Sequence, residues 1–229
     1  MSSLRKVWVI VRKDLSLEKR SREMLSSMFV FALIVILVFS FSFELRVERA
    51  GQVAPGVLWV AITFAGMLGL ARSFILERDQ GCLDGLLLCP VDRSVLYLAK
   101  VLSNLLFISM TEAIILPLYF ALFNLPFRPL LLPILLLGTV GFSAVGTLVS
   151  AMTVYARARE VMLPILLFPI FMPALIAAVQ LTAAVLDAAD GYVPYQAWSE
   201  VEHWLQLLVG FDVIFLVVSY IAFDYVVEE

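Results

Sequence analysis

Residues 24–43 read MLSSMFVFALIVILVFSFSF, a continuous apolar run that contains no Asp, Glu, Lys or Arg. An α-helix of about 20 residues is about 30 Å long, which matches the hydrocarbon thickness of a bilayer. A strand of a membrane β-barrel would instead alternate apolar and polar residues over about 10 positions. The run therefore indicates a membrane-spanning helix.

The whole chain has the same character. Hydrophobic residues make up 62% of its 229 residues, against about 45–50% in a soluble domain, and the mean hydropathy is +1.00. We predict an all-α integral membrane protein: a cytoplasmic interfacial helix over residues 1–23 and one six-span membrane domain over residues 24–229. The expected spans are residues 24–43, 53–71, 95–123, 130–154, 161–186 and 205–227.

The N-terminal segment has an apolar stripe at helical spacing, formed by Leu4, Val7, Trp8, Val11 and Leu15. We expect this helix to lie in the membrane interface, with its apolar side on lipid and its cations near anionic headgroups. Two interpretations stay open: a generic topology anchor, and an elbow helix that braces the first span.

Lys and Arg residues set the expected orientation. Seven of the 16 precede the first span, four follow the second and two follow the fourth, whereas the opposite side has only Arg46, Arg49 and Arg128. By the positive-inside rule both termini should be cytoplasmic, in the inner membrane. We expect no cleavable signal peptide, because no A-x-A site follows the first span. Residues 187–204, with His203 and Trp204, should form an outside loop.

Residues 76–100, LERDQGCLDGLLLCPVDRSVLYLAK, separate the second and third spans. Between Asp79 and Cys89 a helical stripe is formed by Cys82, Leu83, Leu86 and Leu87, and Pro90 ends the run. A helix of about 11 residues is too short to cross lipid. It can dock into a groove on a soluble partner, or simply connect two spans. In this reduced compartment Cys82 and Cys89 should form no disulfide, and their spacing fits no metal site.

Several spans carry features that can serve function or packing. Glu112 should face the bundle interior, where its partner could be Gln180, a hydroxyl of the fourth span, or a second protomer. Its role can be structural or linked to transport. Small residues of the fourth span should let helices approach closely: Gly138, Gly141, Ser143, Gly146 and Thr147. Prolines of the fifth span should bend it, as static kinks or as a flexible element: Pro164, Pro169 and Pro173.

The segment between spans two and three resembles the coupling segment of ABC-2-type transporter permeases. The residues that carry this likeness are Glu77, Gly81, Leu83, Asp84, Leu86, Leu87 and Pro90. Three further stretches are similar to the haem exporter protein B family, the CcmB permeases of cytochrome c maturation. They are APGVLWVA (54–61), AKV (99–101) and LFPIFMPALI (167–176).

This resemblance implies the permease subunit of an ABC transporter for haem trafficking. Such a subunit pairs with a copy of itself and with a cytoplasmic ATPase, haem exporter protein A. Membrane protein C, small protein D and a periplasmic haem chaperone complete the machinery. ATP hydrolysis would drive release of the loaded chaperone or export of haem, and Asp79 with Asp84 and the leucines would dock the ATPase.

The chain itself contains no G-x-x-x-x-G-K-[ST] sequence, so ATP and Mg²⁺ should bind to the partner subunit and this chain should not be an enzyme. Haem is then cargo and not a resident cofactor, since His203 is the single histidine. Nucleic acid is not an expected partner. The alternative function is an ABC-2-type exporter of a drug, lipid or polysaccharide, and a membrane scaffold without an ATPase is a third.

Overall fold

The computed structural model describes residues 3–44, 50–79, 92–154, 156, 158–187 and 195–226. All regular structure in these ranges is α-helical, in agreement with the predicted class. Six of the helices are long and apolar enough to cross a membrane, namely all except α1. The helices are α1 (Ser3–Ser21), α2 (Glu23–Glu44), α3 (Ala50–Asp79), α5 (Arg93–Leu122), α6 (Leu131–Thr153), α7 (Arg159–Asp187) and α8 (Tyr195–Val226).

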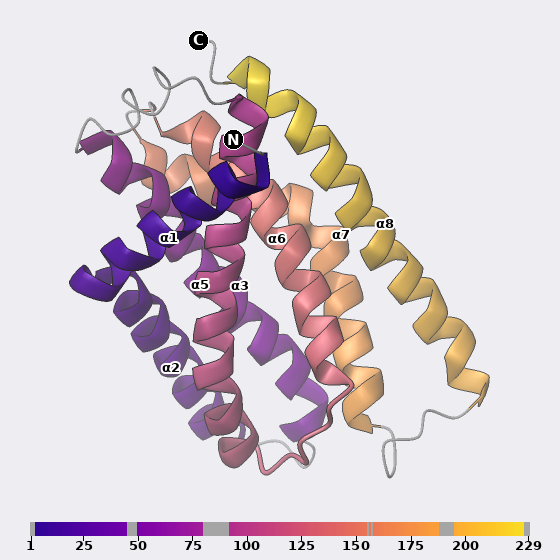
Figure 1. The fold of residues 1–229 in the computed structure, drawn as a ribbon. Helices are drawn as coiled ribbons and strands as arrows, with labels where there is room; N and C mark the ends of the chain where they lie inside the picture. Colours follow the sequence, from indigo (N-terminus) through magenta and orange to yellow (C-terminus); the bar gives the residue numbers. More distant parts are fainter. Residues whose placement is uncertain are drawn as a thin grey trace.

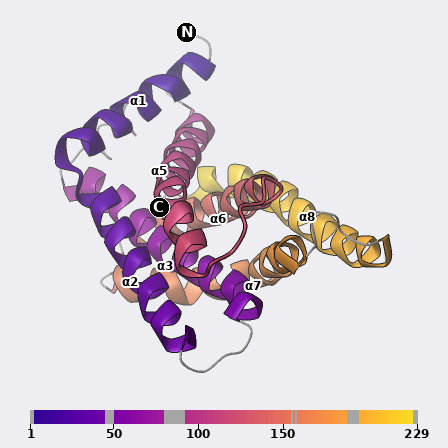
Figure 2. The same ribbon diagram turned by 90° about the horizontal axis from the view of Figure 1, so that it is seen from below.

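The six long helices run side by side, and α1 lies crosswise to them near one end, at the outer edge of the bundle beside α2 and α5 (Figures 1 and 2). The apolar segments of α3 and α6 are the most buried, and those of α2 and α8 are the most exposed. Helix α6 packs against α3, α5, α7 and α8. Its small residues therefore face neighbours on several sides.

Both ends of the described chain lie at the α1 end of the bundle (Figure 1). There, the Arg93 guanidinium donates a hydrogen bond to the Asp224 carbonyl (3.1 Å), and the Ser94 hydroxyl donates to the Asp224 carboxylate (3.3 Å). These bonds fix the start of α5 against the end of α8.

The start of the last helix differs from the prediction. Helix α8 begins at Tyr195, ten residues before the expected boundary at Leu205, so His203 and Trp204 lie in a helix and not in a loop. Val201, Trp204 and Leu207 recur at helical spacing and pack against the core. Polar residues on the opposite face, including Glu202 and Gln206, lower the local hydropathy. For this reason hydropathy placed the start of the helix too late in the sequence.

Helix α1 also corrects an expectation. Val11 of the predicted lipid-facing stripe is fully buried, and Val7 and Leu15 pack against the same cluster of residues from α5, α6 and α8. Trp8 remains exposed. The stripe therefore faces mainly protein, and α1 packs principally on α5 and only slightly on α2, the first span.

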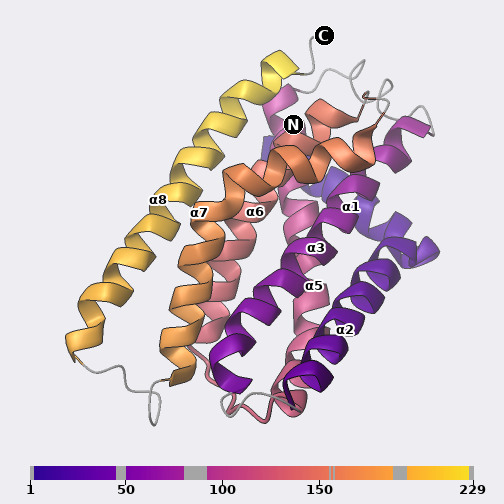
Figure 3. The same cartoon turned by 180° about the vertical axis from the view of Figure 1, so that it is seen from behind.

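Two helices depart from straight spans of bilayer length. Helix α3 continues eight residues beyond the predicted end at Ala71, because its last turns are polar and extend past the apolar segment. Helix α7 contains Pro164, Pro169 and Pro173 and is bent, so that its first part runs across the α1 end of the bundle (Figure 3). Each proline removes an internal hydrogen bond, which accounts for a bend in this helix.

Candidate functional site

Glycines on α6 let two large groups approach its backbone. A Cβ atom added at Gly138 would overlap the ring of Trp59 on α3, and one added at Gly141 would overlap the carboxylate of Asp212 on α8. Gly146 is likewise in contact with Leu70. The small-residue pattern of the sequence thus serves contacts within one chain, on two different sides of α6.

Two threonine hydroxyl groups of α6 meet polar side chains of α5. Thr139 donates a hydrogen bond to Glu112 Oε1 at 2.6 Å, and Asn104 Nδ2 donates to the Thr147 hydroxyl at 3.0 Å. All four side chains are buried. A polar group inside an apolar bundle is costly unless it is hydrogen-bonded, so these pairs fix the register between α5 and α6.

Further hydrogen bonds join α6 and α3 to the rest of the bundle. The Tyr97 hydroxyl donates to the Ala144 carbonyl (3.1 Å), and the Ser150 hydroxyl donates to the Leu70 carbonyl (2.8 Å). The Trp59 indole N–H donates to the Thr182 hydroxyl on α7 (3.0 Å). Trp59 belongs to the APGVLWVA stretch, and its side chain is 1% exposed. That stretch therefore supplies a buried link between α3 and α7.

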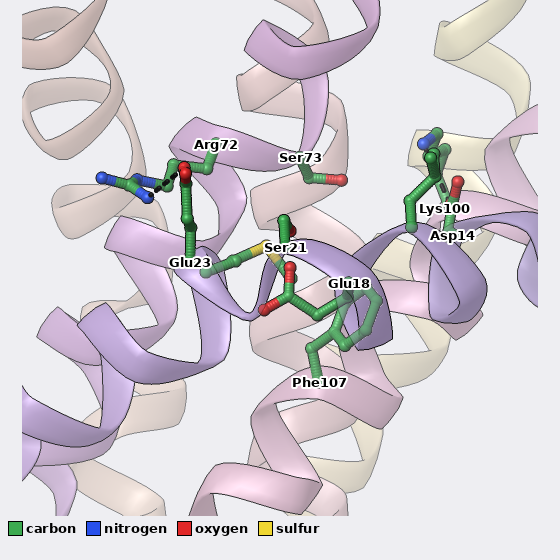
Figure 4. Close-up of a pocket in the computed structure, with 10 residues that line it drawn as sticks. Asp14, Glu18, Ser21, Glu23, Arg72, Ser73, Lys100 and Phe107 are labelled. Atoms are coloured by element: carbon green, nitrogen blue, oxygen red, sulfur yellow. Dashed lines mark hydrogen bonds and ion pairs between the residues drawn. The ribbon is translucent and has the colours of Figure 1, made fainter.

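A second polar cluster lies where α1 meets α2, α3 and α5 (Figure 4). Lys100 Nζ lies 3.0 Å from Asp14 Oδ2, and both side chains are buried. Glu18 accepts the backbone N–H of Leu25 (2.8 Å) and so occupies a carboxylate position at the start of α2, where the helix dipole favours negative charge. These residues line a cavity of about 50 Å³, large enough for water.

The remaining wall of this cavity is more exposed. Arg72 on α3 and Glu23 at the start of α2 form an ion pair at 3.6 Å, with much of both side chains in solvent (Figure 4). Lys100 belongs to the AKV stretch at the start of α5. The cluster thus joins α1 to three spans at the end of the bundle from which the segment between α3 and α5 leaves.

Only some of the candidate site residues predicted from the sequence lie within the described residues. Glu77 and Asp79 lie in the last turn of α3, and the rest of the proposed coupling segment lies outside the described residues: Gly81, Leu83, Asp84, Leu86, Leu87 and Pro90. Of the three partners considered for Glu112, the structure has a hydroxyl of the fourth span. Gln180, Pro169 and Pro173 are exposed on α7, and Pro164 is half-buried.

Several polar residues of the described bundle were not anticipated. Asp212 is 4% exposed on α8, and neither of its carboxylate oxygens has a hydrogen-bond partner among the described residues. The Ser143 hydroxyl is in the same situation. Asp212 interrupts an apolar run in the same way as Glu112, so the same rule applies to both. The Asp14–Lys100 pair gives no such local signal, because its partners are 86 residues apart.

The described network contains hydrogen-bonded side chains and backbone groups, not an aligned nucleophile and base. It joins α1 to the spans and α6 to its neighbours, which suits a bundle whose helices must keep their register. The role that this arrangement supports is structural: buried hydrogen bonds hold neighbouring helices in register.

Comparison with known proteins agrees with this architecture. The profile of the family described as CcmB protein matches residues 5–229. A heme exporter protein B of Pseudomonas aeruginosa is 32% identical over 170 residues, covering 73% of this chain and 76% of the relative. Its namesakes from Rhodobacter capsulatus (30%, covering 75% and 80%) and Paracoccus denitrificans (31%, covering 81% and 84%) are similarly related. The chain is a multi-pass membrane protein and belongs to the CcmB family.

Proposed function

We propose that this chain is the membrane permease subunit of an ABC transporter complex that handles haem for cytochrome c maturation. The observation that carries the proposal is the family match, which extends over residues 5–229 and therefore over all six spans. The relatives named above are haem exporter proteins, and the six apolar helices supply the membrane domain that such a function needs.

In this proposal a separate cytoplasmic ATPase, haem exporter protein A, supplies the energy. The absence of a P-loop sequence from the chain supports the division of labour. Two copies of the chain would bind two ATPase subunits and associate with membrane protein C and small protein D. Hydrolysis of ATP would then drive release of the haem-loaded periplasmic chaperone or export of haem.

The ATPase would dock on residues 77–90, between α3 and α5. Leu83, Leu86 and Leu87 would supply buried contacts, while Asp79 and Asp84 would set the orientation of the partner. Support comes from α3, whose polar last turns carry the chain beyond the apolar segment up to Asp79. The location of the chain ends and α1 at the same end of the bundle fits the proposal that both termini are cytoplasmic.

Haem staining of membrane proteins from a strain that lacks this chain tests the function. We expect all c-type cytochromes to be lost while the haem-loaded chaperone accumulates, because the release step would be missing. A plasmid-borne wild-type copy is the control and should restore the staining. Normal c-type cytochromes in the deletion strain would contradict the proposal and favour export of another substrate.

A further inference from the structure

A groove of about 540 Å³ opens between α1, α2 and α5, next to the small polar cavity described above, with which it shares Glu18 and Phe107. This volume is within the range of about 300–1,000 Å³ that is usual for small-molecule sites. Its walls are mainly apolar and include Leu25, Phe29, Phe107, Met110 and Ile114. The groove is therefore large enough to hold a ligand and too apolar to be filled by water alone.

Charge and apolar surface occupy different levels of the groove. Lys19 and Arg22 line it at the turn between α1 and α2, where Arg22 has a positive φ of 56°. Phe29 lies seven residues further along α2, which is about 10 Å down the helix axis. Phe107 and Ile114 on α5 are separated by a similar distance. The groove thus has a cationic mouth at the bundle end and an apolar wall that continues into the membrane segment.

The two cations at the mouth are available for a ligand. Both side chains are exposed, and neither forms an ion pair with another described residue. Glu18 also lines the groove, but its carboxylate already accepts the Leu25 N–H. The mouth therefore has a net positive charge and complements an anionic headgroup.

We propose that this groove binds one anionic phospholipid, with its headgroup at Lys19 and Arg22 and an acyl chain along Phe29, Met110 and Ile114. Met110 and Ile114 are exposed on the outer surface of the bundle, so the groove is open to the bilayer and a chain can enter laterally. Basic sites of this kind between helices select anionic lipids, because each Lys or Arg near the surface adds attraction. The bound lipid would fix α1 against α2 and α5.

The test measures lipid retained by the purified full chain, by native mass spectrometry in micelles that contain phosphatidylglycerol and phosphatidylcholine in equal amounts. We expect retention of one phosphatidylglycerol in preference to phosphatidylcholine. K19Q/R22Q should weaken phosphatidylglycerol binding about tenfold or more. The variant K19R/R22K keeps both positive charges and should retain the preference for phosphatidylglycerol. R5Q/R12Q removes the same number of charges elsewhere on α1 and should also retain the preference.

A second variant tests the apolar part of the groove. Met110→Trp fills the groove without changing its charge, and should reduce retention of both lipids while the chain remains folded by circular dichroism. Equal retention of the two lipids by the wild type, or equal loss of phosphatidylglycerol binding in K19Q/R22Q and R5Q/R12Q, would overturn the proposal. Displacement of phosphatidylglycerol by haem at equal concentration would also overturn it, and would mark the groove as a cargo site.

Discussion

Glu112 is a carboxylic acid within a membrane span, and its side chain is buried against α6. The side chain is 6% exposed and accepts a hydrogen bond from Thr139 at 2.6 Å. A carboxylate in a lipid-facing position would cost about 2.5–3.5 kcal/mol on insertion scales. The contact with α6 offsets part of that cost and ties two spans together.

A double-mutant cycle measures this contact. We expect E112L and T139V to be non-additive, with a coupling energy of about 0.6 kcal/mol and at most about 1.7 kcal/mol, which is typical of hydrogen bonds between membrane helices. Unfolding of the detergent-solubilised chain in SDS gives the four free energies. E112Q is the control, because its amide oxygen can still accept the Thr139 hydroxyl. A coupling energy of zero would show that this bond does not stabilise the bundle.

Buried acidic residues also show what can and cannot be predicted from the local sequence. A charged residue inside an apolar run can be recognised from the sequence, and Glu112 was; Asp212 carries the same signal on α8. The partner of such a residue cannot be read locally. For Glu112 the sequence left Gln180, a hydroxyl of the fourth span and a second protomer open, and only the packing of α5 on α6 shows that Thr139 lies 2.6 Å away.

At the scale of elements, α1 is held to the bundle by a buried ion pair as well as by apolar packing. Asp14 and Lys100 lie 3.0 Å apart, and Lys13 lies 3.3 Å from the same carboxylate. Loss of one member of a buried pair leaves a buried charge without its main counter-ion, which costs about 3–5 kcal/mol. Replacement of both members removes that penalty.

We therefore expect D14N and K100M each to destabilise the protein by about 3 kcal/mol or more, and D14N/K100M to recover much of the loss. Thermal unfolding of the purified chain, followed by tryptophan fluorescence, gives these differences. R72M is the control: it breaks the exposed Arg72–Glu23 pair and should cost less than about 1 kcal/mol. If D14N and R72M were equally mild, the buried pair would not be what holds α1.

The helices themselves could be predicted to different degrees. The ends of α2, α5 and α6 lie within about two residues of the predicted spans, because bilayer thickness sets the length of each apolar run. The start of α8 was missed, since helical structure outside the membrane leaves no trace in hydropathy. The packing of the apolar stripe of α1 against α5 was also not predicted, because an amphipathic helix can place such a stripe against lipid or against protein.

At the scale of the whole molecule, α5 and α6 are closely linked, because three hydrogen bonds join these two helices within the described residues. Helix α6 is tied to α5 through Thr139 and Thr147 and to α3 through Ser150. Hydrogen bonds thus link α6 to α3 and to α5, two of the helices that line the polar cluster at the α1 end of the bundle. That end also holds the last turn of α3, at which the proposed ATPase-docking segment begins.

The measurement that tests the account most directly is the amount of ATPase subunit that co-purifies with a tagged permease. In the helix predicted from the sequence of residues 79–89, Leu86 belongs to the apolar stripe, and Leu88 would lie about 200° away from Leu86 around the helix axis. L86R should lose most of the ATPase while membrane levels of the permease stay normal. L88R, a matched change on the opposite face, should retain it. Wild-type amounts of ATPase with L86R, or equal losses with both variants, would contradict docking through the leucine face.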